Sequence, residues 1–115
     1  MKDINGTLQY KNKTYTLVFN LNVMEKIQEE YGTLAEWGHL TGGSGEEPSA
    51  KAVLFGLTEM INEGIDIDNE ENGTSDPMLT RKQVGRMMTE VGLAEATKVL
   101  NETVIGSTQS ELKNE

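Results

Sequence analysis

The amino-acid sequence predicts an α+β domain, mostly α, in which an N-terminal β-hairpin packs on a small bundle of four to five helices. Apolar and polar residues alternate over residues 4–20, as they do in strands with one buried face. Further along the chain, apolar residues recur at helical spacing and glycines separate the helical segments. The chain has 115 residues, which is the length of one domain. We therefore assign residues 1–106 to a single domain and residues 107–115 to a polar C-terminal tail.

The predicted hairpin joins two alternating segments, residues 4–10 and 14–20, through a tight turn at Asn12-Lys13. The register that follows pairs residues of one apolar face: Tyr10 with Tyr15, Leu8 with Leu17, and Gly6 with Phe19. The turn and the hydrophobic pattern thus agree. Because an isolated hairpin is only marginally stable, we expect helices to cover this face.

The strand pattern leads directly into a helical stripe that ends at Gly32. Two residues, Asn20 and Asn22, are alternative N-caps for this helix. A second, short helical unit begins at Thr33 and has Trp37 as an apolar anchor. These two units are expected to pack on the hairpin.

The later part of the chain contains three more helical patterns. Residues 50–63 carry more apolar residues than one stripe requires, so this helix is expected at the centre of the domain. A helix over residues 80–91 begins with a capping box formed by Thr80 and Gln83. The last helix covers residues 93 to about 105.

Two segments, residues 41–49 and 65–79, are predicted to be flexible loops between the helices. The first is rich in glycine, but no Gly-Lys-[Ser/Thr] follows and its two glutamates would repel a phosphate group. The second imitates the first half of an EF-hand calcium loop, but Leu79 stands where the bidentate glutamate is needed. We therefore predict no metal site and no phosphate site in either loop.

The charge of the chain restricts its partners. With 19 acidic and 10 basic residues, the formal net charge is -9, which repels nucleic-acid phosphates and anionic membrane surfaces. No cysteine occurs, so disulfides and thiol chemistry are excluded. No apolar run approaches the roughly 18–20 residues of a membrane span. We expect a cytoplasmic protein that binds neither nucleic acid nor membrane.

The sequence contains no recognisable catalytic motif. Its single histidine, His39, cannot form a metal site alone, and no serine or cysteine nucleophile has a base nearby in sequence. The paired carboxylates are expected to face solvent. We therefore predict that the protein is not an enzyme and that it has no catalytic residues, cofactor or metal.

Four large side chains are the candidate partner-binding residues: Trp37, Phe55, Met87 and Met88. Phe55 falls off the main apolar stripe of its helix, so it either packs on a second neighbour or faces a partner. Methionine side chains are flexible and suit adaptable binding surfaces as well as cores. For each of the four, a core position is the alternative interpretation.

The order of motifs along the chain resembles a known family. Residues 4–37 contain a short strand with a glycine, a turn, and the sequences Tyr-Thr-Leu-Val-Phe, Asn-Leu-Asn-Val-Met-Glu-Lys-Ile-Gln-Glu-Glu-Tyr-Gly and Thr-Leu-Ala-Glu-Trp. Then follow Ala-Val-Leu-Phe-Gly-Leu, an acidic loop, Thr-Arg-Lys-Gln-Val-Gly-Arg-Met-Met and Leu-Ala-Glu-Ala. Over roughly residues 4–106 the chain resembles the small tail assembly chaperones of long-tailed bacteriophages and of their prophage and gene-transfer-agent relatives. The acidic segment 65–79 is longer here than is usual in that family.

This resemblance implies a non-enzymatic role in building the phage tail. The implied partners are the tape-measure protein and the tail-tube protein. A homo-oligomer is a further candidate assembly, and the sequence leaves the oligomeric state open. It implies a place in the cytoplasm of the bacterial host and absence from the mature virion. Contacts in which helices of the partner lie in grooves of this domain would shield the tape-measure chain. The alternatives are a structural phage protein, such as a head–tail connector or tail terminator, and an acidic inhibitor or DNA mimic.

Overall fold

The computed structural model of the chain describes residues 6–43 and 45–113, with side chains described up to residue 107. Its elements follow the chain in this order: β1 (Gly6–Tyr10), β2 (Lys13–Leu17), α1 (Leu21–Tyr31), α2 (Leu34–Gly38), a π-helical turn (His39–Gly43), α3 (Ala50–Asn72), α4 (Arg81–Val91) and α5 (Leu93–Lys113). The α+β, mostly α fold class with an N-terminal hairpin is confirmed.

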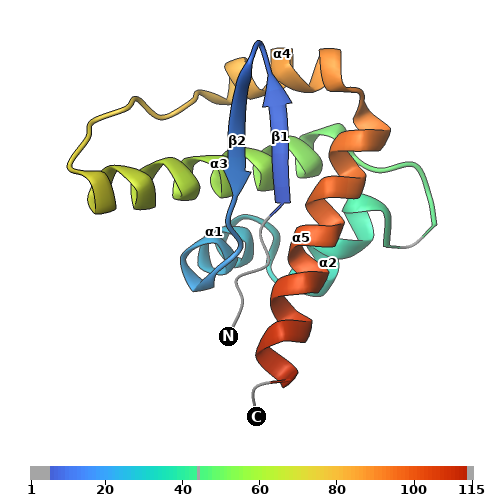
Figure 1. Cartoon of the computed structure of the whole chain (residues 1–115). Helices are drawn as coiled ribbons and strands as arrows, with labels where there is room; N and C mark the ends of the chain where they lie inside the picture. Colours follow the sequence, from blue (N-terminus) through green and yellow to red (C-terminus); the bar gives the residue numbers. More distant parts are fainter. Residues whose placement is uncertain (1–5, 44, 114–115) are drawn as a thin grey trace.

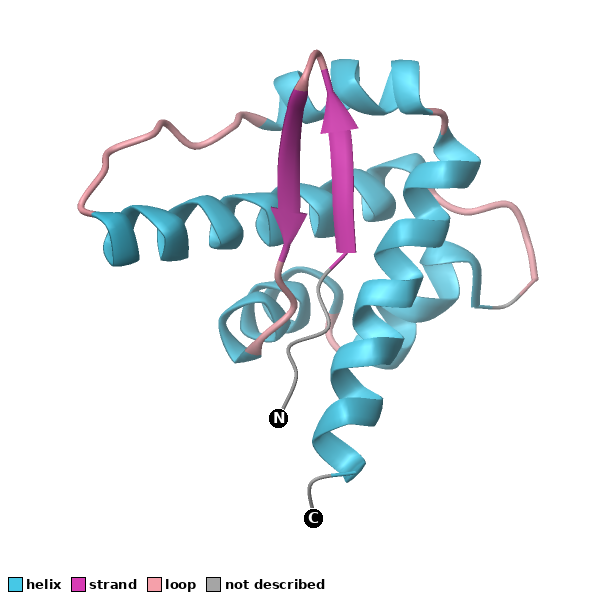
Figure 2. Ribbon diagram, in the orientation of Figure 1, coloured by secondary structure: helices cyan, strands magenta, loops and turns pink. Residues whose placement is uncertain are grey.

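The hairpin and α3 form the centre of the fold (Figure 1). The hairpin crosses in front of α3, and α5 descends beside β1, so β2 packs on α3 and β1 packs on α5. Helix α4 passes behind the hairpin tip, and α1 and α2 lie below (Figure 2). The core fills the space between these elements. Its buried apolar residues are Leu8, Leu17, Phe19, Val23, Ile27, Trp37, Ala52, Val53, Leu57, Met60, Ile61, Val84, Met87, Met88, Ala96 and Leu100.

The hairpin register predicted from the sequence is wrong by two residues. The structure pairs Tyr10 with Lys13, Leu8 with Tyr15, and Gly6 with Leu17. The turn is formed by Lys11 and Asn12, whose φ angles are 51° and 64°. Positive φ at both central residues is the signature of a type I′ turn, whose twist matches that of the strands. Because side chains alternate with period two, the shift leaves the predicted apolar face unchanged.

The helix starts follow the capping residues. Asn20, not Asn22, is the N-cap of α1, because its side chain accepts a hydrogen bond from the Val23 amide at 3.1 Å. Thr33 caps α2 in the same way. Thr80 and Gln83 form the predicted capping box at α4, with both hydrogen bonds present.

Helix α3 is longer than predicted, and the expected loop 65–79 is correspondingly shorter. The helix continues through Gly64 to Asn72 and ends at Gly73, which adopts a left-handed conformation with φ 65°. Gly64 is inside the helix because the hairpin lies against it: a Cβ atom at Gly64 would come 2.5 Å from the carbonyl oxygen of Thr16. This glycine therefore permits close packing and does not end the helix.

Two other predicted irregular segments are partly helical. Residues 39–43, which overlap the start of the expected loop 41–49, form the π-helical turn, which is kinked because Thr41 and Gly42 have non-helical backbone angles. Ser44 lies outside the described residues. Thr41 is fully buried there, and its hydroxyl donates to the carbonyl oxygen of Trp37 at 3.1 Å. Helix α5 does not end near Ile105, since it continues to Lys113, so the predicted tail 107–115 is helical over 107–113. Residues 114–115 lie outside the described part of the chain.

Candidate functional site

The structure places three of the four predicted partner-binding side chains in the core. Trp37 is 1% exposed, and its indole N–H donates to the carbonyl oxygen of Ala52 at 3.0 Å. Met87 and Met88 are 2% and 5% exposed, because α4 is covered by α3 on one side and by α5 on the other. The core interpretation therefore describes these three residues, which offer no surface to a partner in this conformation.

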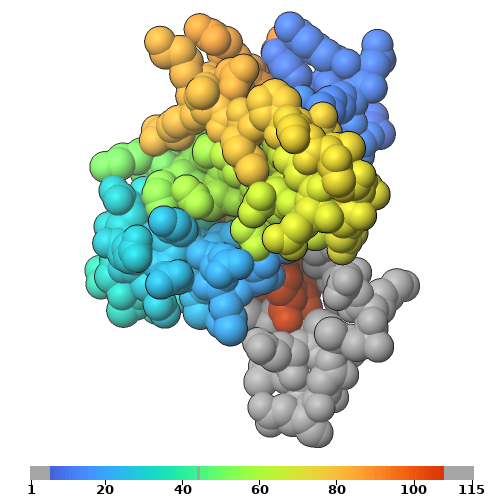
Figure 3. All heavy atoms as spheres, turned by 90° about the vertical axis from the view of Figure 1, so that its left-hand side faces the viewer, coloured from blue at the N-terminus to red at the C-terminus, as the bar shows by residue number. Residues whose placement is uncertain are grey.

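Phe55 is the predicted residue that keeps a partly exposed side chain. It belongs to a stripe along α3 that points away from the hairpin and consists of Phe55, Thr58, Asn62 and Asn69, all half-buried. We call these four residues the outer stripe of α3. In Figure 3 the surface of α3, in green, is set back between α4 in orange and α1 and α2 in blue to cyan. This recess, which we call the groove, lies over the N-terminal half of α3, the half that carries Phe55 and Thr58.

An aromatic pair lies at the α1 side of this groove. The rings of Tyr31 and Phe55 meet edge to face, with centroids 5.5 Å apart and an interplanar angle of 76°. The Tyr31 hydroxyl oxygen is buried and has no hydrogen-bond partner in the described part of the chain. Burial raises the pKa of this hydroxyl above its ordinary value of 10.0, Glu30 adds to the increase, and Arg81 opposes it. The pair thus supplies an apolar floor with one polar atom that water does not reach.

The two walls of the groove carry opposite charge. Helix α4 begins with Arg81 and Lys82, both exposed. Helix α1 ends with Glu29 and Glu30, also exposed. Glu30 and Arg81 lie close enough to the Tyr31 hydroxyl to change its pKa in opposite directions, so charges of both signs lie near this part of the groove.

Beyond Thr58, the outer stripe is covered by residues 73–80, which we call the strap. The strap returns from the end of α3 to the start of α4 (Figure 1). The side chain of Asn69 hydrogen-bonds the main chain of Asp76, and the side chain of Asn62 hydrogen-bonds the main chain of Leu79. The outer stripe thus has an open part, at Phe55 and Thr58, and a part occupied by the chain itself.

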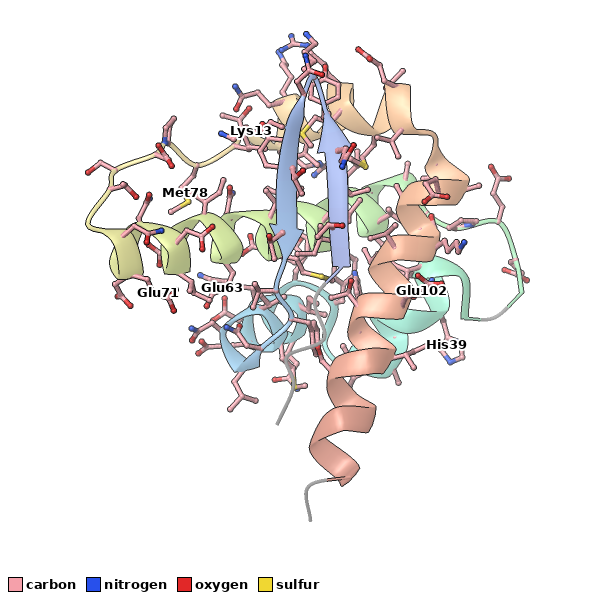
Figure 4. All side chains as sticks on the ribbon, viewed as in Figure 1. Lys13, His39, Glu63, Glu71, Met78 and Glu102 are labelled. Carbon is pink, nitrogen blue, oxygen red and sulfur yellow. The ribbon has the colours of Figure 1, made fainter. Side chains whose placement is uncertain are left out.

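The flank of α3 that faces away from the strap is hydrogen-bonded to α1 and to the residue before it. The side-chain amides of Asn20 and Asn22 both donate to the same carboxylate oxygen of Glu63, at 2.7 and 3.1 Å. Figure 4 shows Glu63 and Glu71 on the lower side of α3, away from Met78 on the strap. These contacts hold α1 in place as one wall of the groove.

The candidate metal ligands of the described residues are dispersed over the fold. Among them, no three His, Asp or Glu side chains are arranged to hold a metal ion. The residues that imitated a calcium loop, Asp68, Glu70 and Asn72, lie on helix α3. His39 is exposed in the π-helical turn (Figure 4). In the described part of the chain, no helix has both the length and the apolar content needed to cross a membrane.

The sequence analysis missed Tyr31 and three residues of the outer stripe, Thr58, Asn62 and Asn69. A signal for the two asparagines was present, because Phe55, Asn62 and Asn69 recur every two helical turns. That signal was hidden by the expectation that the helix ends before residue 65. No protein-family model, curated protein or solved structure matches this chain.

Proposed function

We propose that this protein is a non-enzymatic tail assembly chaperone of a long-tailed bacteriophage or a related prophage, which binds the tape-measure protein in the host cytoplasm. The observation that carries the proposal is the outer stripe of α3. It presents the half-buried ring of Phe55 in a groove between α1 and α4, on an otherwise acidic chain with net charge -9. The order of motifs that resembles this chaperone family supports the specific partner.

The physical requirements of the role agree with the properties of the domain. A tape-measure chain is long and prone to aggregation before a tail tube encloses it. A domain that shields it needs an apolar contact face and a strongly charged remainder that keeps the complex soluble. The open groove supplies the first and the exposed carboxylates of α1 and α3 supply the second.

Co-expression with the tape-measure protein encoded in the same phage gene cluster tests this proposal. We expect the soluble fraction of the tape-measure protein to rise several-fold with this chain and to fall again with Phe55→Ala. Leu21→Ala is the matched control, because Leu21 is 73% exposed on α1 and lies outside the stripe. Thermal melts of both variants check that the fold survives. Equal solubility of the tape-measure protein with and without this chain would refute the proposal.

The protein content of purified virions distinguishes a chaperone from a structural tail protein. A chaperone is absent from purified virions, whereas a head–tail connector or a tail terminator remains in them. Mass spectrometry of purified particles gives the answer directly. Detection of this chain at stoichiometric amounts would favour the structural alternative.

A further inference from the structure

The side chain of Asn62 binds both main-chain groups of one strap residue. Its Nδ2 atom donates to the carbonyl oxygen of Leu79 at 2.9 Å, and its Oδ1 atom accepts from the Leu79 amide at 2.8 Å. A primary amide that accepts and donates in this way reproduces the edge of a β-strand. Such a contact recognises the polypeptide main chain and is independent of the side chain that the bound residue carries.

Asn69 repeats this arrangement two helical turns along α3. Its Nδ2 atom donates to the carbonyl oxygen of Asp76 and its Oδ1 atom accepts from the Asp76 amide, both at 3.0 Å. Two turns of helix advance about 10.8 Å. Three residues of extended chain, from Asp76 to Leu79, advance about 10 Å. The two asparagines are therefore spaced to bind every third residue of an extended segment.

Two strap side chains add to this contact: the Thr74 hydroxyl donates to Asn69 Oδ1 at 2.9 Å, and Leu79 packs against the core. Residues 73–78 are exposed, and Met78 is 43% exposed although it is apolar. Leu79 is half-buried. The strap is thus held mostly by hydrogen bonds to the two asparagines at a partly wet surface, with Leu79 as its apolar anchor. Water competes for the same hydrogen-bonding groups, which favours local opening over global unfolding.

The binding surface extends past the end of the strap. After Leu79 the chain leaves α3 to begin α4 at Arg81, while the outer stripe continues to Thr58 and Phe55. A separate segment that continued along the stripe beyond Asn62 would reach the ring of Phe55, about two helical turns away on α3. The strap occupies one part of a longer surface.

From this geometry we infer that Asn62 and Asn69 form a main-chain receptor for an extended polypeptide segment, and that the strap is its replaceable occupant. The ligand is an unfolded segment with free main-chain N–H and C=O groups and an apolar side chain that packs on Phe55. That this ligand belongs to the tape-measure protein rests on the proposed function. The receptor itself does not depend on that proposal.

A synthetic peptide with the strap sequence, Thr-Ser-Asp-Pro-Met-Leu-Thr (residues 74–80), is the probe. The tethered strap competes at an effective concentration on the order of millimolar, so the peptide must reach similar concentrations. In nuclear magnetic resonance spectra of the labelled full chain, we expect saturable shifts of the side-chain amides of Asn62 and Asn69.

Two controls isolate main-chain recognition. A peptide methylated on the nitrogens that correspond to Asp76 and Leu79 keeps every side chain but lacks both N–H donors, so we expect it to bind about tenfold more weakly. The double variant Asn62→Ala/Asn69→Ala lacks both side-chain amides, so we expect the peptide to cause no saturable shifts along α3 in that variant. Asn101→Ala on α5, whose amide donates to the carbonyl oxygen of Thr41, should leave the binding of the peptide unchanged.

Three results would overturn the inference. The first is that the side-chain amide signals of Asn62 and Asn69 do not shift at saturating peptide. The second is that the methylated and unmethylated peptides bind with equal affinity. The third is that the main-chain amides of Asp76 and Leu79 exchange with solvent only through global unfolding. The proposed chaperone function fails on a different result, an unchanged solubility of the tape-measure protein. The two outcomes can therefore be told apart.

Discussion

The indole ring of Trp37 lies directly against the backbone of Gly56, so that a Cβ atom at Gly56 would come 2.4 Å from the ring atom Cζ2. The indole N–H donates to the carbonyl oxygen of Ala52, one turn earlier on α3. Trp37 is 1% exposed and cannot move aside without breaking this hydrogen bond. The close approach of α2 to α3 thus depends on the absence of a side chain at Gly56.

Gly56→Ala should destabilise the protein by roughly 1–3 kcal/mol, because the added methyl group overlaps a rigid buried ring. Gly85→Ala is the matched control on α4. There the nearest contact of an added Cβ atom is Leu54 Cδ1 at an ordinary 3.9 Å. Alanine at position 85 should therefore stabilise the helix by about 0.5–1 kcal/mol. Urea unfolding of both variants measures the difference, and equal effects would contradict the packing described.

The hairpin turn gives a test that separates two registers. Lys11 has a φ angle of 51°, which a lysine adopts at a cost and an asparagine adopts readily. Lys11→Asn should therefore raise the free energy of unfolding by several tenths to about 1 kcal/mol. Lys13→Asn should bring no such gain, because Lys13 is a strand residue paired with Tyr10. A larger gain from Lys13→Asn would restore the register with a turn at Asn12-Lys13.

Local chemistry predicted most of the fold, and long-range packing decided the rest. The N-caps Thr33, Ser49 and Thr80 act within four residues of themselves, so the sequence alone identifies them. Gly64 resembles a helix stop until the hairpin is placed beside it, since the reason for that glycine is a carbonyl group about fifty residues away in the chain. The predicted hairpin register was wrong because moving the turn by one residue shifts the pairing by two residues, which preserves the same apolar face.

The candidate site was less predictable for a related reason. Trp37, Met87 and Met88 belong to types that occur in cores and in interfaces, and only their neighbours in space decide between the two. Phe55 was distinguished by its place off the main stripe, and it remains partly exposed. Asn62 was not recognisable as a main-chain ligand because its partner, Leu79, belongs to a segment whose path sequence reasoning did not define.

The capping box at α4 should contribute measurably to stability. Thr80→Ala removes the acceptor for the Gln83 amide, so we expect a loss of about 1 kcal/mol. Thr89→Ala is the control within the same helix, because its hydroxyl donates to the carbonyl oxygen of Gly85 on an exposed face. That change should be neutral or slightly stabilising, since alanine is the better helix former. Thermal unfolding of the two variants compares them, and a neutral Thr80→Ala would show that the box adds nothing.

The buried hydroxyl of Tyr31 should make the protein less stable in alkali. Its folded-state pKa is raised above 10.0, mainly by burial, with Glu30 adding to the effect and Arg81 opposing it. The unfolded chain therefore loses this proton at lower pH than the folded chain. Above the unfolded pKa the unfolded state binds fewer protons, so the free energy of unfolding falls as the pH rises toward the folded pKa.

Tyr31→Phe should remove this part of the alkaline loss. At neutral pH it should leave stability unchanged or increase it, because the hydroxyl is buried without a hydrogen-bond partner among the described residues. Urea unfolding at about pH 7 and about pH 11 measures both effects. Tyr10→Phe serves as the control, since the Tyr10 hydroxyl donates to Glu90 at an exposed position. If Tyr31→Phe loses as much stability as the wild type between these pH values, then the Tyr31 hydroxyl keeps access to water in the folded protein and the groove floor at Phe55 is wet.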